Sequence, residues 1–401
     1  MDKINLNIQK EAQKYIQNNK KYKDFEQWKY TNINNFKFSE TPYEPNIKEK
    51  NIPCKDYEII LYNGMINKIG EKINNNISIL NLKDGISKNL FQSKQLLNKI
   101  INYNTDISIA YNTAYWDHGF LININSNTTI KHPITIKHYI DEGSKSAIFN
   151  FRNMIIIDKN VHAKILYHEI SPIEYCTNST WESFIYENSN IEFVFYSENK
   201  QAKQIMNFFS NIYKNSNFKI HAIDIEGKIK KNNYFINLCE KNSQCYFNGI
   251  NILNNNDHID SFINIYHKNK FTLSNLDFKI ITNDSSRSIL FAKAIIEKMS
   301  ANSEAYQKNN NLMMSPKSII NANPQLKIYN DDVKCTHSST TGDLDDEIIY
   351  YMATRGIKPN HAKQLMVKGF LDETLNKIEI DYFKLYILNK IDQHLNHVYT
   401  I

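Results

Sequence analysis

The sequence predicts a mainly β protein in which a solenoid of short strands lies between helical regions at the two ends. From about Ile107 to Tyr329 the chain consists of short runs rich in Ile, Phe, Tyr and Val, such as FLININ and AIFNFRNMIII, which are separated by Asn, Asp, Ser or Lys. Such runs are typical of strands. No long helical pattern interrupts them, which argues against a βαβ fold and leaves a sandwich, a barrel or a solenoid. The number and shortness of the strands favour the solenoid, although no fixed repeat length is visible.

The sequence pattern of residues 1–104 predicts a separate N-terminal cap of mixed and helical character. It begins with a helix-like pattern at Ile4, Ala12, Tyr15 and Ile16, continues through EQWKYTNINNF, and ends with the helix-like SKNLFQSKQLLNKII. The strand pattern follows as a core over residues 105–336.

Residues 337–401 predict a compact helical tail. Asp343 can cap a first helix, and Gly356 stands in the position favoured after a last turn. That helix presents a face of Leu344, Ile348, Tyr351 and Met352. Pro359 opens a second helix, and DYFKLYILNKIDQHL supplies a third. We expect the second helix to turn Ala362, Leu365, Met366 and Phe370 inward.

Composition limits the location and the partners. The 401 residues include five cysteines without a CxxC pair, which indicates a reducing compartment and no disulfide framework. No apolar run reaches the roughly 18 residues needed to span a bilayer, and the N-terminus has no signal-peptide pattern, so we expect a cytoplasmic protein without a membrane partner. The net charge of +6 is spread along the chain, and we therefore expect no nucleic-acid partner.

Cys335 and His337 form the candidate site. If LKIYNDDVKCTH continues as a strand, the two side chains share one face, because alternate residues of a strand point the same way. A thiolate and an imidazole suit iron, zinc or an iron–sulfur unit, but a closed site takes about four ligands, so a second subunit would have to supply the rest. The structural alternative is a small buried Cys beside a His at a strand end.

Other motifs are weaker. His162 and His168 share a strand face by default, and His394 and His397 are interpreted as solvated helix positions. The Lys–Ser pair in EGSKSA lacks the GxxxxGK[ST] framework, and GxSxG, HExxH and GxGxxG patterns are missing from the sequence. The residues themselves therefore predict no independent catalytic apparatus.

The stretch YNDDVKCTHSSTTGDLDDEIIYYMATRGI resembles the corresponding segment of the SufB/SufD family, the scaffold subunits of the SufB, SufC and SufD complex that assembles iron–sulfur clusters. AKQLMVKGFLDE is similar to the helix that follows it in the family. EQWKYTNI resembles the N-terminal WKYT element, and HPITIKHYI and RNMIIIDKNVHAKILYHEI resemble the central strands. The resemblance favours the SufD branch, because the CxxCxxxC motif usual in SufB is missing here.

The resemblance implies a right-handed parallel β-helix between N-terminal and C-terminal α-helical regions. It implies a non-catalytic scaffold that pairs with SufB through the β-helix ends and docks the SufC ATPase on its C-terminal helical region. His337 and, with less support, Cys335 would contact a transient iron or iron–sulfur cluster at the SufB interface. Reduced FAD in the complex is a further implication, without a dinucleotide fingerprint in the sequence. For SufC docking we nominate Leu344, Ile348, Tyr351, Met352, Leu365 and Phe370.

Three alternatives remain open. The chain could be a SufB-like paralogue that acts as the main scaffold, or a β-helix carbohydrate-active enzyme, which would need paired carboxylates on an open face. It could also be a docking protein whose His337 is idle. The family's His-Gly-Ala-Thr is replaced here by His337-Ser-Ser-Thr, so the local turn geometry at the site can differ from the family's.

Overall fold

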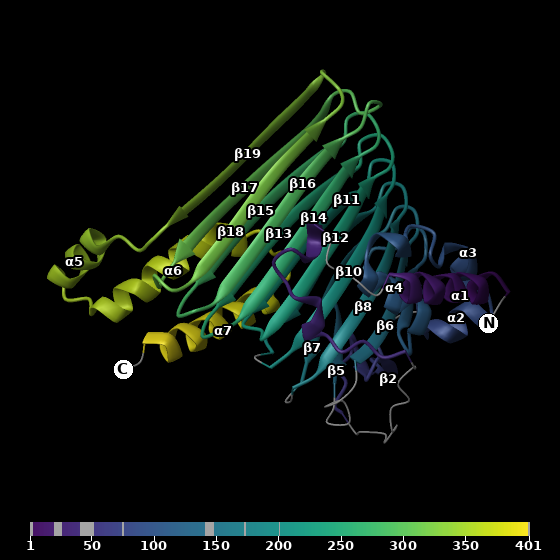
Figure 1. Cartoon of the computed structure of the whole chain (residues 1–401), viewed down its shortest axis with the longest axis horizontal. Helices are drawn as coiled ribbons and strands as arrows, with labels where there is room; N and C mark the ends of the chain where they lie inside the picture. Colours follow the sequence, from purple (N-terminus) through teal and green to yellow (C-terminus); the bar gives the residue numbers. More distant parts are fainter. Residues whose placement is uncertain are drawn as a thin grey trace.

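The strands form two mainly parallel sheets, each with one antiparallel pair at its beginning, that wind as a solenoid, with helices near both ends of the chain (Figure 1). The structure is a computed structural model that describes residues 3–19, 26–40, 52–73, 76–140, 148–171, 174–199 and 201–399. From β4 onward, successive strands alternate between the two sheets, so each pairs in parallel with the strand two places away in the sequence. The predicted fold class is confirmed.

Within the described part of the chain, sheet A contains ten strands. In spatial order they are β19 (Val333–Gly342), β17 (Ser303–Met313), β15 (Leu273–Thr282), β13 (Gln244–Leu253), β11 (Asn217–Ile225), β9 (Asn190–Ser197), β7 (His162–Ile170), β5 (Ile134–Tyr139), β1 (Glu58–Tyr62) and β2 (Met65–Ile69). Sheet B contains nine. They are β18 (Ile319–Ile328), β16 (Arg287–Ile296), β14 (His258–His267), β12 (Ile229–Leu238), β10 (Lys203–Ile212), β8 (Cys176–Ile185), β6 (Ile148–Ile157), β4 (Phe120–Ile124) and β3 (Ile77–Asn81).

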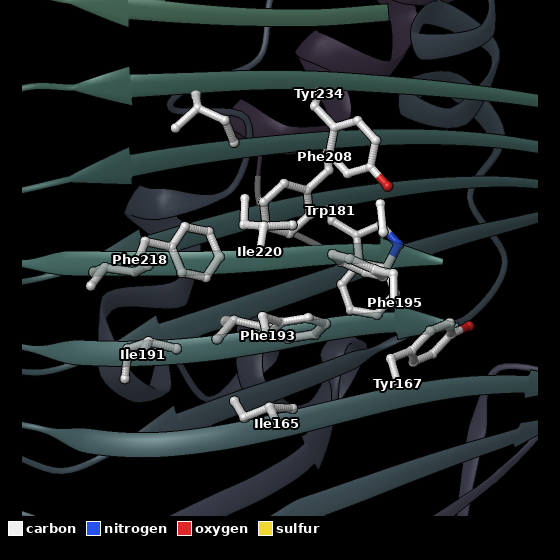
Figure 2. Packing of buried hydrophobic residues seen from close by; sticks show 14 of the residues in the cluster. Ile165, Tyr167, Trp181, Ile191, Phe193, Phe195, Phe208, Phe218, Ile220 and Tyr234 are labelled. Carbon is white, nitrogen blue, oxygen red and sulfur yellow. The ribbon is translucent and has the colours of Figure 1, made fainter. Parts of the chain in front are cut away.

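The space between the sheets is filled by aliphatic and aromatic side chains (Figure 2). Trp181 of β8 is 1% exposed and meets Phe195 of β9 edge to face, with ring centroids 5.4 Å apart. Apolar side chains of successive rungs stack on one another, so burial continues along the solenoid axis. This burial is the main force that holds the two sheets together.

Asparagines in the left-handed conformation turn the chain from sheet B to sheet A. Their φ angles lie between +57° and +61°, which Asn tolerates better than most residues. They are Asn127, Asn160, Asn188, Asn215, Asn242 and Asn302. The first five are joined by side-chain hydrogen bonds of 2.8 to 3.1 Å, and we call this stack the asparagine ladder.

The N-terminal helices cover the outer face of the first strands of sheet B, where Asn112 donates to the backbone oxygens of Phe151 and Asn178. α1 (Lys3–Asn18) packs on α4 (Ile107–Tyr115), beside the short helices α2 (Leu82–Ser87) and α3 (Ser93–Leu96). Residues 26–40 cross sheet B: Trp28 donates to Asp106 at 2.8 Å, and Thr31 donates to Asp260 at 2.6 Å. The WKYT element, residues 28–31, therefore joins the N-terminal cap to the strands of sheet B.

Two expectations for this region are wrong. Residues 107–115 form a helix, capped by Asp106, rather than the first part of the strand region. SKNLFQSKQLLNKII does not form one helix, because Asn89, Phe91 and Gln92 adopt positive φ angles that interrupt it.

The C-terminal helices α5 (Asp346–Thr354), α6 (Pro359–Leu375) and α7 (Asp381–Tyr399) confirm the helical tail (Figure 1). α6 and α7 cover the outer face of sheet A with an apolar cluster. The cap of α5 is Asp345, which accepts from two backbone N–H groups, and not Asp343. α6 buries Val367 and Leu371 along with Ala362, whereas Leu365 is exposed.

The boundary placed between residues 336 and 337 falls inside β19, which continues to Gly342. Among the described helices, none is long and apolar enough to cross a membrane.

Candidate functional site

The solenoid ends in two strands, β18 and β19, that have a neighbour on one side only. β18 contains Pro324, which has no N–H to offer a further strand, as is usual for an edge position. Ile319 and Ile328, at the two ends of β18, are exposed by 46% and 45%. Unpaired edges with apolar side chains are a common place for another chain to bind.

Cys335 lies on the inner face of β19, opposite Ala305 of β17. It packs beside the small cluster of Ala294, Ile296 and Ala305. This burial raises the pKa of the Cys335 thiol above its usual value, so the side chain is a protonated thiol at neutral pH. Because a metal binds the thiolate, binding at Cys335 would release a proton.

His337 shares that inner face but is exposed at the mouth of the solenoid, opposite Gln307. Its Nδ1 atom lies 3.2 Å from the backbone oxygen of Pro324 in the facing sheet. A carbonyl only accepts, so Nδ1 carries the proton and the lone pair of a neutral imidazole is on Nε2. Metal-binding histidines usually have this tautomer, held by a hydrogen bond to the other nitrogen.

The predicted pair is therefore brought to one face, at an edge without a neighbour. The described ranges hold no group of three or more His, Cys, Asp or Glu side chains arranged to bind a metal. This chain itself offers one imidazole nitrogen and one thiol, which are two of the roughly four ligands of an ordinary metal site.

His168 and His394 are held in structural surroundings, whereas His162 is exposed at the start of β7. Burial lowers the pKa of His168 to about 4, and its ring packs beside those of Tyr196 and Tyr386. His394 was expected in solvent, which is wrong: it is 9% exposed and lies 3.4 Å from Glu226. α7 packs on the solenoid through the face that carries His394. EGSKSA and the side chain of His397 lie outside the described residues.

The six nominated docking residues differ in exposure. Ile348, Tyr351 and Leu365 are exposed by 43%, 60% and 38%, whereas Leu344 and Phe370 pack against the cluster under α6 and α7. Met352 is half-buried. Two residues outside the nominated set are more exposed than any of the six, Tyr350 of α5 at 72% and Leu385 of α7 at 62%. Tyr350 was not predicted because it lies off the face expected for its helix.

Residues 138–370 match the family model described as SUF system FeS cluster assembly, SufBD core domain. This segment covers the solenoid from β5 to β19 together with α5 and most of α6. The chain therefore belongs to the SufB/SufD family of iron–sulfur cluster assembly proteins.

Within the family, the chain is similar to proteins named SufD. It is 33% identical to the iron–sulfur cluster assembly protein SufD of Escherichia coli over 117 residues, 29% of this chain and 28% of that protein. It is 33% identical to SufD of Bacillus subtilis over 113 residues, 28% of this chain and 26% of that protein. A SufBD family protein of Synechocystis is 30% identical over 102 residues, 25% of this chain and 22% of that protein. The aligned segments thus span about a quarter of the length of these relatives.

Proposed function

We propose that this chain is a non-catalytic scaffold subunit of the SUF assembly complex. Its open solenoid end pairs with SufB, and the interface holds a transient iron or iron–sulfur cluster. Its C-terminal helical region docks the SufC ATPase. The similarity to SufD of E. coli and B. subtilis favours the SufD role over a SufB-like one. Reduced FAD stays a prediction of the resemblance.

One observation carries the proposal: the chain presents half a metal site on an unpaired edge. The free Nε2 of His337 and the thiol of Cys335 lie on the inner face of β19, where a second solenoid stacked end to end would face them. A partner that supplies the other ligands would complete the site and cover both edges at once. The iron or cluster is the cargo of such a site rather than a resident cofactor.

The test is to co-purify the chain with its SufB and SufC and to reconstitute the cluster under anaerobic conditions. Iron content and visible absorbance are compared for wild type, His337→Ala and Cys335→Ser. We expect His337→Ala to remove most of the cluster because Nε2 is the ligand already oriented by Pro324, and Cys335→Ser to remove less.

The matched control is His162→Ala, which replaces an exposed histidine at the start of β7, far from the open end. The control should keep the full iron content. If wild type, His337→Ala and His162→Ala bind equal iron in an intact complex, His337 is not a ligand and the shared site is wrong.

The proposed contact with SufC involves α5. Ile348 and Tyr351 are exposed there by 43% and 60%. Ile348→Asp should abolish retention of SufC on the immobilised chain. The control is Met299→Asp, an equally drastic change at a side chain that is 70% exposed in a solenoid turn. Equal retention by both variants would place the SufC contact elsewhere.

A further inference from the structure

Two inner columns of sheet A become polar in the last two rungs. In earlier rungs these columns hold aliphatic or aromatic side chains or glycine, as at Leu276 and Phe278 of β15. The register continues them as Gln307 and His337, and as Asn309 and Ser339. A third inner column already holds polar residues in earlier rungs and ends as Asn311 and Thr341. In the first two columns the change begins one rung before the open end, where a structural core would still be expected.

Most of these polar groups satisfy one another. Asn309 and Asn311 exchange side-chain hydrogen bonds of 2.9 and 2.7 Å, and Ser339 donates to Asn309 at 3.0 Å. Asn311 also donates to the backbone oxygen of Thr340 at 3.0 Å. These two columns therefore form a closed network that needs no ligand.

Gln307 is the exception. Its side-chain nitrogen donates to the backbone oxygen of Gln325 in the facing sheet at 3.2 Å. The backbone oxygen of Gln325 can only accept a hydrogen bond, so the amide nitrogen of Gln307 must face it. The amide oxygen Oε1 of Gln307 therefore points away from Gln325. Gln307 is 6% exposed, and no donor among the described residues reaches Oε1. Other buried side-chain atoms of the described residues also lack a partner, but Oε1 of Gln307 is the one that lies in the same column as His337.

The register places Gln307 next to the candidate ligand. Gln307 and His337 are direct partners on adjacent parallel strands, which lie about 4.8 Å apart, and their side chains stack in one column. We propose that Gln307 is a further residue of the His337 site: its amide oxygen accepts a hydrogen bond from a water ligand of the divalent iron that binds His337 Nε2. The inference rests on the proposed function, because it assumes that His337 binds iron.

The assignment explains why a glutamine occupies a column that would otherwise accept leucine. A metal-bound water is a strong donor because the cation polarises it, and a buried acceptor on its far side fixes its position. Gln307 would then act as a positioning residue: it orients the water without contacting the metal, and its nitrogen is anchored so that the oxygen does not turn away.

The experiment measures Co²⁺ binding to the full chain without partners. Co²⁺ has the charge of ferrous iron and binds imidazole well. Its paramagnetic effect on the ring resonance of His337, assigned by its loss in His337→Ala, gives a dissociation constant. We expect Gln307→Leu, which continues the Leu276 column, to bind about 10-fold more weakly, as is typical when a ligand loses its outer hydrogen bond. We expect Gln307→Glu to bind more tightly than wild type.

Ser338→Ala is the control, because Ser338 is adjacent to His337 but exposed on the other face of β19, and it should bind as wild type. The melting temperature of Gln307→Leu should stay close to that of wild type, since the variant loses an unpaired buried acceptor together with the hydrogen bond to Gln325 and keeps its packing. An unchanged melting temperature separates a folded variant with a damaged site from a misfolded one.

Equal Co²⁺ affinity in wild type and Gln307→Leu would overturn the proposal. It would mean that Oε1 accepts a hydrogen bond from an internal water instead. Equal affinity in Gln307→Glu would overturn it even if the leucine variant did not fold. Absence of a Co²⁺ effect at His337 in wild type would overturn it as well. Scaffold pairing would remain testable, since co-purification with SufB does not depend on Gln307.

Discussion

Replacing Phe271 by Asn should stabilise the protein. Phe271 occupies the corner position that holds an asparagine in the neighbouring turns, and its φ angle is +58°. Its backbone N–H donates to Ala301 just as that of Asn242 donates to Lys270, one rung earlier. A bulky side chain is an outlier in this conformation, and the asparagine ladder ends at Asn242 for this reason.

The magnitude follows from several contributions. The left-handed conformation costs a residue with a Cβ atom about 1–2 kcal/mol, and Asn recovers part of that by local hydrogen bonding. The variant loses a contact in which Lys241 lies 4.9 Å from the ring centroid, worth about 0.5–1 kcal/mol at an exposed site. It gains a ladder hydrogen bond to Asn242 of about 0.5–1 kcal/mol. Because Phe271 is 44% exposed, the variant also loses the burial of the covered part of the ring, and we expect a net gain of at most about 0.5 kcal/mol.

Urea unfolding of the full chain, followed by tryptophan fluorescence, measures the change. Phe271→Ala is the matched control, because it removes the ring and the contact with Lys241 but leaves a Cβ atom at positive φ. It should be no more stable than wild type. If Phe271→Asn is no more stable than Phe271→Ala, backbone strain at this corner is not the reason the ladder ends there.

Three further predictions follow from the buried groups. Arg152→Leu should cost about 3–5 kcal/mol in urea unfolding, because Glu182, 2.8 Å away and fully buried, would remain as an unpaired charge; a loss under 1 kcal/mol would contradict this. Burial lowers the pKa of His267 to about 3 from 6.5, so the unfolded chain binds a proton that the folded one does not, and stability falls as the pH drops below about 6.5. His267→Asn should therefore lose less stability than wild type between pH 7 and 5, and equal losses would refute the assignment. Leu371→Ala should cost about 2–5 kcal/mol and reduce hydrogen-exchange protection of α6, because Leu371 is fully buried under that helix; the exposed Leu365→Ala should leave that protection unchanged.

The strand region could be predicted because a solenoid interior imposes alternation on every rung. The repeat length could not, because the spacing of paired residues is not constant. Lys203 pairs with Ile229, 26 residues later, whereas Arg287 pairs with Ile319, 32 residues later. The turns absorb the difference, so the period is hidden in the sequence although the rungs are regular in space.

The helix α4 was missed for a different reason. Every residue from Ile107 to Ala114 is buried between the cap and the strands, so the segment has no polar face. Without a polar face, a short apolar run does not distinguish a helix from a strand. Its one local signal is Asp106, whose side chain accepts from the N–H of Ser108 at the helix start.

The candidate site was predictable only where its residues are adjacent in sequence. Cys335 and His337 are two positions apart in a strand, and that spacing alone puts both side chains on one face. Gln307 is thirty positions earlier, and its place beside His337 depends on the pairing of β17 with β19, which no local pattern encodes. In a solenoid, only the last rung can present inward-facing side chains to a second molecule, because every earlier rung is covered by the next. A site shared between two chains is therefore expected at that rung, with its supporting residues one rung further in.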